Sequence, residues 1–172
     1  MKLLLIALML VSSSAFAQNA IVGRWKTIDD ETGKPKSIVE IFEKDGIVYG
    51  KIERLFRTPE EDQNPKCDKC SGDKKDQLVI GMQIMEGLKK DSDVKWSGGK
   101  ILDPNNGKTY SCKAEVIENG QKLKLRGFIG VSLLGRTQTW IRETEAAAQA
   151  SNAQSPAVAP TETPAAASKK KN

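Results

Sequence analysis

Apolar and polar residues alternate with a period of two along much of this chain, and short turn signals separate the alternating stretches. The clearest stretch is 109–116, where four side chains of apolar or aromatic type share one face: Tyr110, Cys112, Ala114 and Val116. Residues 122–129 alternate in the same way, and Asn119-Gly120 between the two stretches supplies the positive φ angles that tight hairpins need. A period of two is typical of a half-buried strand, so the sequence predicts an antiparallel hairpin here.

Turn-forming residues recur at 29–33, 45–46, 97–99, 103–107 and 119–120. Between them we expect further strands at 21–28, 37–44, 47–55, 78–88, 100–102 and 133–142. The spacing of Met and Leu in 78–88 would also suit a short helix. Seven or eight short strands joined by tight turns predict an all-β fold, an antiparallel meander that closes into a small barrel because closure removes exposed strand edges.

Both ends of the chain differ from this domain. Residues 1–17 contain Lys2, an apolar core and the small-x-small sequence Ala15-Phe16-Ala17, the pattern of a secretory signal peptide cut after Ala17. The apolar core is shorter than the roughly 20 residues that a membrane-spanning helix needs, so we expect no transmembrane anchor. The mature protein is therefore expected to be periplasmic or secreted.

Residues 145–172 contain ten Ala and three Pro but no Leu, Ile, Met or aromatic residue, and they end in Lys169-Lys170-Lys171 before Asn172. So little large apolar surface cannot offset the entropy of ordering a chain, which predicts a disordered tail. The three lysines suit either contact with an anionic envelope surface or a solubilising end. One barrel domain, residues 18–144, remains.

Six short motifs resemble the DUF2147 family of exported bacterial proteins over about residues 21–143. They are Val22-Gly23-Arg24-Trp25, Cys67-Asp68-Lys69-Cys70, Ile101-Leu102-Asp103-Pro104, Gly107-Lys108-Thr109-Tyr110, Arg126-Gly127-Phe128-Ile129-Gly130 and Gly135-Arg136-Thr137-Gln138-Thr139-Trp140. That family has no known function, so the resemblance brings no catalytic residues.

A looser resemblance connects the chain with calycin barrels such as lipocalins and avidins. Their first strand carries Gly-x-Trp near the closed end of the barrel, and an Arg from a late strand packs across the Trp ring. Gly23, Trp25 and Arg142 match these positions. The resemblance implies a cation–π contact between Arg142 and Trp25.

Composition argues against most enzyme classes and against nucleic-acid binding. The chain has no His, which removes the commonest general base and the Ser-His and Cys-His nucleophile pairs. Two acidic runs, 29–31 and 60–62, lie in expected loops, and nothing in the sequence places them across a cleft as sugar hydrolysis requires. The net charge of +5 comes from basic residues mixed with acidic ones rather than from a basic stripe. We expect a non-enzyme without cofactor.

The three cysteines favour a structural role. In an oxidising compartment the default is a disulfide, and Cys67–Cys70 is the preferred pair, with Cys112 then a small buried apolar residue. A bridge from the 67–70 segment to Cys112 is the alternative. A zinc site lacks its second half, and residues 103–107 fit a turn better than a calcium loop, so no metal is predicted.

The last expected strand has two interpretations. One parity presents Arg136, Gln138, Trp140 and Arg142, and the other presents Thr137, Thr139 and Ile141. If the first set faces inward, the barrel has a polar and aromatic interior; if it faces outward, Trp140 is exposed, which is uncommon.

The leading hypothesis is a non-catalytic barrel that binds a small apolar or amphipathic ligand. Its candidate lining residues are Trp25, Tyr110, Arg126, Arg136, Gln138, Trp140 and Arg142. The alternative is an envelope structural or protein-interaction module whose barrel is filled with side chains. The first hypothesis requires a hollow interior and the second does not.

Overall fold

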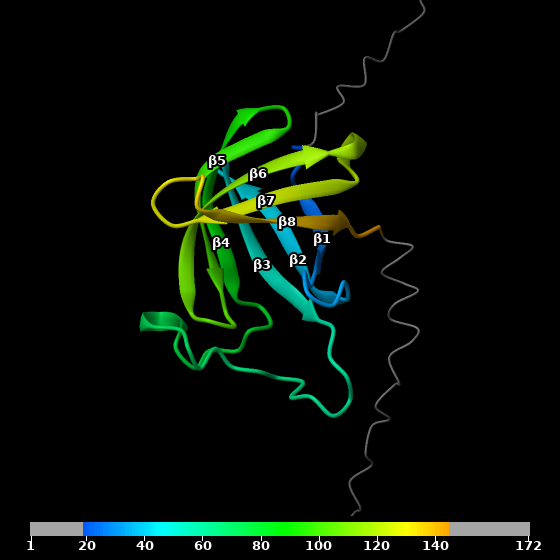
Figure 1. Cartoon of the computed structure of the whole chain (residues 1–172), viewed down its shortest axis with the longest axis vertical. Coiled ribbons are helices and arrows are strands. Elements are labelled where there is room, and N and C mark those ends of the chain that lie inside the picture. Colours follow the sequence, from blue (N-terminus) through cyan, green and yellow to red (C-terminus); the bar gives the residue numbers. More distant parts are fainter. Residues whose placement is uncertain (1–18, 145–172) are drawn as a thin grey trace, which may run out of the picture. The chain divides into compact units, whose positions relative to one another are not determined.

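The computed structural model describes residues 19–144; the expected signal peptide and tail lie outside this range. Within it, eight antiparallel strands form a closed up-and-down barrel in which each strand pairs with the next and the last pairs with the first (Figure 1). The strands are β1 (Gly23–Ile28), β2 (Pro35–Lys44), β3 (Ile47–Leu55), β4 (Gln83–Ser92), β5 (Lys95–Asp103), β6 (Lys108–Ile117), β7 (Lys122–Phe128) and β8 (Gly135–Arg142). The predicted all-β meander and its closure are confirmed.

The predicted hairpin is the most regular part of the sheet. Strands β6 and β7 pair without a register shift from Ser111 opposite Phe128 to Ile117 opposite Lys122. A one-turn 3₁₀ helix, Glu118–Gly120, joins them, and all three of its residues have positive φ. Along β6 the buried side chains are those of the predicted apolar face, so the period of two identified both the strand and its inner side.

Both strands expected between residues 78 and 102 are present, but their bounds and the position of the turn between them were wrong. The strand expected at 78–88 is β4, which begins at Gln83, and no helix forms there. The expected turn at 97–99 lies inside β5, while the chain turns at 93–94. Gly99 serves a packing role instead, since a Cβ there would lie 2.5 Å from Leu88 Cγ, whereas a Cβ on Gly98 would meet nothing within 4 Å. Glycine inside a strand often marks such a close approach or a bulge, and the β5–β6 register does shift between Trp96 and Gly99.

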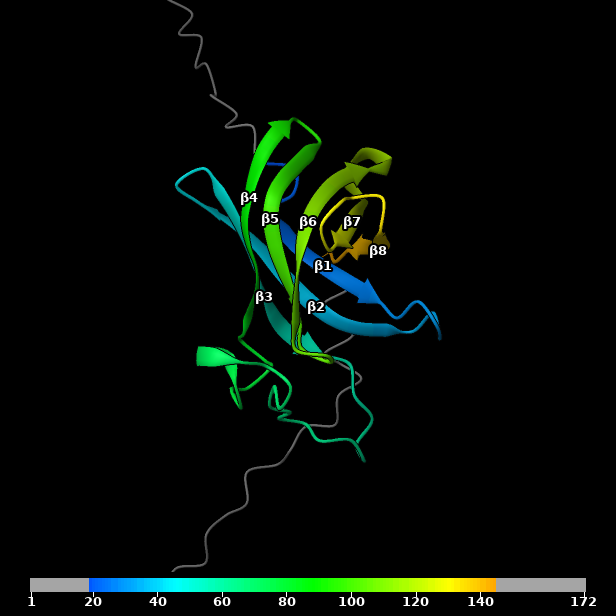
Figure 2. The same ribbon diagram turned by 60° about the vertical axis from the view of Figure 1, so that its left-hand side comes forward.

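The apolar core fills one half of the barrel. All three Trp side chains are buried, Trp25 on β1, Trp96 on β5 and Trp140 on β8, with Met85 and Leu88 of β4 among them. At the other end, residues 56–82 connect β3 to β4 without a strand of their own. This segment, named here the cystine loop, extends beyond the end of β3 and returns to the barrel (Figure 2). The packed half and the loop-bearing half therefore differ in character.

The Cys67–Cys70 disulfide predicted for this loop is present, and Cys112 is a free, buried thiol. The alternative bridge to Cys112 is wrong, because Cys112 lies inside the sheet on β6 with 1% of its surface exposed. Burial raises the pKa of Cys112 to about 12, so the thiol is neutral at physiological pH.

Candidate functional site

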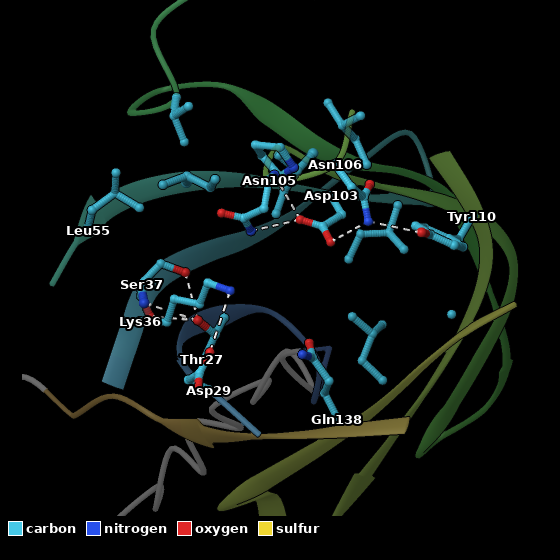
Figure 3. A pocket seen from close by; sticks show the side chains of 18 of the residues that line it. Thr27, Asp29, Lys36, Ser37, Leu55, Asp103, Asn105, Asn106, Tyr110 and Gln138 are labelled. Atoms are coloured by element: carbon cyan, nitrogen blue, oxygen red, sulfur yellow. Dashed lines mark hydrogen bonds and ion pairs between the residues drawn. The ribbon is translucent and has the colours of Figure 1, made fainter. Parts of the chain in front are cut away.

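A cavity of about 1650 Å³ occupies the half of the barrel that the core leaves open. Its wall comes from the ends of β1, β3, β5 and β7, the beginnings of β2, β4, β6 and β8, and the cystine loop. Figure 3 shows an open space between Thr27 and Ser37 on one side, Tyr110 on another and Gln138 on a third. A barrel filled throughout with side chains, as the alternative hypothesis required, does not describe this half.

The inner part of the cavity is apolar. Leu125 of β7, Trp140 of β8 and Ile84 of β4 line it, and each has less than a tenth of its surface exposed. Val79 of the cystine loop and Ile52 of β3 are equally buried and lie along the same wall. Such a surface gains free energy when an apolar ligand group replaces the water against it.

One wall carries a buried hydroxyl pair. The hydroxyl oxygens of Thr27 and Ser37 are 2.7 Å apart, and Ser37 N also donates to Thr27 Oγ1 over 3.0 Å. Both residues are buried, at 8% and 7% exposed. Register explains the pairing, because Thr27 on β1 lies opposite Ser37 on β2. These hydroxyls place hydrogen-bonding capacity beside an apolar floor.

Gln138 continues this polar wall onto β8. Its amide Oε1 accepts from the indole Nε1 of Trp140 over 3.3 Å, and its Nε2 donates to Asp30 Oδ2 over 3.3 Å. The side chain points into the open space in Figure 3. Gln138 therefore links the apolar floor, at Trp140, to the charged rim, at Asp30.

The turn after β5 forms the opposite wall. Asp103 accepts hydrogen bonds from Asn105 Nδ2 and from Asn106 Nδ2, and Asn106 Nδ2 also donates to Tyr110 Oη over 3.1 Å (Figure 3). Gly107 N donates to the Asp103 carbonyl over 2.8 Å. Residues 103–107 thus form the predicted turn, whose carboxylate is occupied by its own asparagines.

The cystine loop is held against this turn. Cys67 Sγ lies 3.4 Å from the carbonyl oxygen of Pro104, a contact rather than a hydrogen bond because a disulfide has no S–H. Gly107 has a φ of +70°, and a Cβ there would lie 1.8 Å from Lys69 O. Only glycine both adopts this positive φ readily and leaves room for the Lys69 carbonyl oxygen. The rim of the cavity therefore depends on close backbone contact between two segments that are distant in sequence.

Charges of both signs surround the mouth. Asp29 accepts from the backbone N–H and the hydroxyl of Thr32, each over 2.9 Å, and these bonds hold the pKa of its carboxyl below the usual value. Lys36 lies 3.8 Å from Asp29, and Arg136 forms an ion pair with Asp30. The first acidic run is therefore engaged in turn and ion-pair contacts at the rim.

Of the seven candidate lining residues, four line the cavity: Tyr110, Arg136, Gln138 and Trp140. The ambiguity of the last strand is thereby resolved, since the parity that contains Trp140 faces inward. Arg136 lies at the rim, where its side chain is 65% exposed. The other three candidates, Trp25, Arg126 and Arg142, lie elsewhere.

Trp25 and Arg142 meet at the packed end, as the calycin resemblance implied. The Arg142 guanidinium carbon is 4.1 Å from the centre of the Trp25 ring, and the indole Nε1 donates to Ile21 O over 2.8 Å. Arg126 contacts the segment between β7 and β8: its guanidinium donates to Ser132 O and Leu133 O. These arginines support backbone rather than a ligand.

Sequence reasoning missed Thr27 and Ser37 as lining residues. The signal was available, because Thr27 shares its inward parity with Trp25, and Ser37 shares that of Val39 and Ile41. Polar residues on an otherwise apolar inner face are informative when a barrel is hollow. The contribution of the cystine loop carried no comparable signal, since its residues follow no period.

The family model for uncharacterized proteins conserved in bacteria, DUF2147, matches residues 23–142. The chain belongs to the DUF2147 family. The matched range spans the whole barrel from the first residue of β1 to the last of β8, so the DUF2147 domain and the barrel coincide. No curated protein matches the chain.

This DUF2147 barrel is similar in fold to protein HP1028 from the human pathogen Helicobacter pylori, which is described as belonging to the lipocalin family. The two are 22% identical, with a TM-score of 0.65, and the match covers 75% of this chain and 86% of that one. At this identity the likeness establishes the lipocalin-like fold alone. Such a fold is compatible with binding a small ligand.

Two further features bear on the class of protein. None of the helices within residues 19–144 is long and apolar enough to cross a membrane. In the same range, no three Cys, Asp or Glu side chains are grouped as a metal site would require.

Proposed function

We propose that this DUF2147 protein is exported to the periplasm and there binds a small apolar or amphipathic ligand in its barrel, without catalysis. The observation that carries the proposal is the cavity itself, with its apolar floor, its buried hydroxyl wall and its charged mouth. A ligand would place an apolar group against Trp140 and Leu125 and a polar group toward Thr27 and Ser37. Cavities for drug-sized ligands are about 300–1,000 Å³, so this one has room for a lipid-sized molecule.

The chemistry of the wall supports a binding role. The acidic side chains at the mouth are bonded to their own loops: Asp29 to Thr32, and Glu61 Oε2 to the backbone N–H of Thr58 over 2.7 Å. With no His in the sequence, the commonest proton-transfer group is missing as well. What remains along the floor is apolar surface and neutral hydrogen-bonding groups, which favour and orient a ligand.

The direct test is to purify the protein from the envelope of the bacterium that makes it and to record its mass under native conditions. We expect an adduct of a few hundred daltons that organic extraction releases and that mass spectrometry identifies as an amphiphile. Sequencing the N-terminus of the same sample tests export, with Gln18 expected as the first residue.

A paired substitution at Gly127 tests whether the cavity is the binding site. Gly127 lines the cavity on β7, its φ is not in the left-handed region, and a Cβ there would meet only ordinary contacts, at 3.6 Å from Tyr110 Cβ. Gly127→Phe should therefore fill the floor without straining the backbone. Gly127→Ala is the matched control, which adds a Cβ but little volume.

The binding readout is the fluorescence of N-phenyl-1-naphthylamine, an apolar probe that brightens away from water. We expect the phenylalanine variant to bind the probe at least tenfold more weakly, about 1.4 kcal/mol, and the alanine variant to bind as the wild type does. Circular dichroism checks that both variants fold. Equal affinity of all three proteins, together with no co-purified molecule, would contradict the proposed function.

A further inference from the structure

The segment between β7 and β8 presents apolar side chains to solvent. We name residues 129–134 the apolar loop. Its four large side chains are highly exposed: Ile129 64%, Val131 60%, Leu133 89% and Leu134 78%. In Figure 1 the loop, drawn in yellow, projects from the ends of β7 and β8. Contiguous exposed apolar groups of this kind mark contact surfaces in soluble proteins.

Hydrogen bonds within the domain hold the backbone of the apolar loop in place. Arg126 donates from Nε to Ser132 O over 2.8 Å and from Nη2 to Leu133 O over 3.0 Å. Its Nη1 donates to Thr137 Oγ1 on β8, and Leu134 N donates to Val131 O. The protein thus satisfies several polar groups of this backbone internally, while the apolar side chains of the loop face outward. A loop that enters a bilayer needs its backbone polar groups bonded within the protein and its apolar side chains on the outside, because the lipid interior offers no water to bond them.

The apolar loop is also part of the cavity mouth. Ile129, Leu133 and Leu134 all line the cavity, on the same side as Arg136 and Phe128. Whatever covers this loop therefore lies directly beside the opening. The loop sits at the entrance, not on a remote face of the barrel.

Two arguments select a lipid surface over a second copy of the chain. The four side chains expose on the order of 500 Å² of apolar surface, less than the roughly 800 Å² per partner of a stable protein interface. A loop that projects also needs a matching groove in a protein, whereas a fluid bilayer adapts to it. The charge is complementary to anionic lipid: the whole chain carries a net +5, of which Lys2 of the expected signal peptide supplies one, and the remainder ends in Lys169-Lys170-Lys171.

We propose that the apolar loop inserts into the surface of an anionic phospholipid bilayer, with the basic charge of the chain as the second attraction. Peripheral attachment commonly needs two such signals, and here one is apolar and the other electrostatic. The insertion places the cavity mouth against the lipid surface. This inference goes beyond the proposed ligand binding and stands without it, because it depends on the apolar surface that the loop exposes to solvent and not on whether the cavity holds a ligand.

Vesicle flotation tests the docking. The chain purified after export is mixed with vesicles of phosphatidylethanolamine and phosphatidylglycerol at a 3:1 ratio. The double variant Leu133→Ser/Leu134→Ser removes the two most exposed side chains, and Val94→Ser, at 43% exposure in the β4–β5 turn, is the matched control. We expect the wild type and the Val94 variant to float with the vesicles and the double variant to lose at least tenfold in partitioning.

A fluorescence variant measures insertion directly. The three native Trp residues are at most 2% exposed and should respond little to lipid. In Leu133→Trp, the added indole should shift its emission to the blue on vesicle addition and be quenched by brominated acyl chains. Proteins without the added Trp provide the background signal.

Three results would overturn the inference. The first is no flotation of the wild type. The second is flotation that salt abolishes and the double variant retains, which would assign binding to charge alone. The third is a dimer of the wild type in light scattering that the double variant loses, which would make a second copy the occupant of the apolar loop. Each outcome leaves the probe-binding result of the Gly127 variants unaffected, so the two proposals fail separately.

Discussion

The guanidinium carbon of Arg142 lies 4.1 Å from the centre of the Trp25 ring, while the guanidinium nitrogens donate to three backbone carbonyls, those of Ala20, Val22 and Gly120. One side chain thereby joins the start of β1, the turn before β7 and the end of β8. The glycine of Gly-x-Trp makes room for it, because a Cβ on Gly23 would lie 2.7 Å from Arg142 Nη1.

Replacing Arg142 should weaken the closure of the barrel. We expect Arg142→Met to cost about 2–4 kcal/mol in the free energy of unfolding, because carbonyl partners and a cation–π contact are lost together. Arg142→Lys keeps the charge but not the planar fork, and should recover less than half of that loss. Urea unfolding followed by fluorescence measures both.

Arg24→Lys is the control for the Arg142 series. Arg24 pairs with Glu53 over 2.6 Å on the surface, with both side chains about one-third exposed. Exposed pairs contribute about 0–1 kcal/mol, so this change should be small. A lysine at 142 as stable as the wild type would show that charge suffices and that the fork is unimportant.

Gly107→Ala should destabilise the rim of the cavity by more than the strain of a positive φ alone would cause. Gly107 and Gly33 have nearly the same φ, +70° and +69°, but a Cβ at 33 meets nothing within 4 Å whereas one at 107 meets Lys69 O. We expect Gly33→Ala to cost about 1–2 kcal/mol from strain and Gly107→Ala clearly more. Hydrogen exchange should also rise at 66–72 only in the Gly107 variant. Equal cost and equal exchange would refute this account of the rim.

Reducing the Cys67–Cys70 disulfide should loosen the cystine loop and leave the barrel folded. The bridge closes a short ring, for which the chain-entropy model gives about 2 kcal/mol. Backbone bonds from Cys67 N to Gln77 O and from Asp76 N to Cys67 O should then exchange faster. Mass-detected hydrogen exchange of the Cys67→Ser/Cys70→Ser variant measures this. Loss of the β-sheet circular dichroism signal would contradict it.

The buried thiol of Cys112 should make the protein sensitive to alkaline pH. Its folded pKa of about 12 exceeds the ordinary thiol value of 9.0 because burial disfavours the thiolate. The stability from the neutral thiol is therefore complete below pH 9.0 and is lost as pH rises through about 12. Relative to Cys112→Ala, the wild type should lose about 2 kcal/mol by pH 10.5.

Denaturant titrations at pH 8 and pH 10.5 measure that difference, since the lysines titrate alike in both proteins. As a companion observation, a maleimide should label Cys112 only after unfolding. A stability gap between wild type and variant that does not change with pH would show that the thiol is accessible to water in the folded state.

Part of the candidate site was predictable because it follows strand periodicity. Tyr110 lies on the inward face of β6, and Gln138 and Trp140 share the inward face of β8. These assignments depend only on the period of two, which the sequence displays directly. Arg126 was expected to line the cavity but does not, because its position is not decided by strand period alone. It lies one residue out of register with Leu125 and Gly127, and its bonds to Ser132 and Leu133 depend on how a loop folds back.

The strands between residues 78 and 102 also show which features local pattern predicts and which depend on neighbouring strands. Gly98 and Gly99 carry the local signal of a turn, yet both lie inside β5, and Leu88 of β4 packs where a Cβ of Gly99 would be. A glycine that permits a turn and a glycine that permits close packing look identical in sequence. Only the neighbouring strand distinguishes them.

By itself, the sequence determined an antiparallel barrel, the inner face of most strands and the family, because each depends on local spacing. It favoured the Cys67–Cys70 disulfide, but the structure decided between that pair and a bridge to Cys112. The tertiary structure alone decided that half of the barrel is hollow, that the cystine loop and the turn at 103–107 form its rim, and that the apolar loop is exposed beside the mouth. These features are differences in volume and contact between segments distant along the chain. Local pattern carries no information about the space that such segments leave between them.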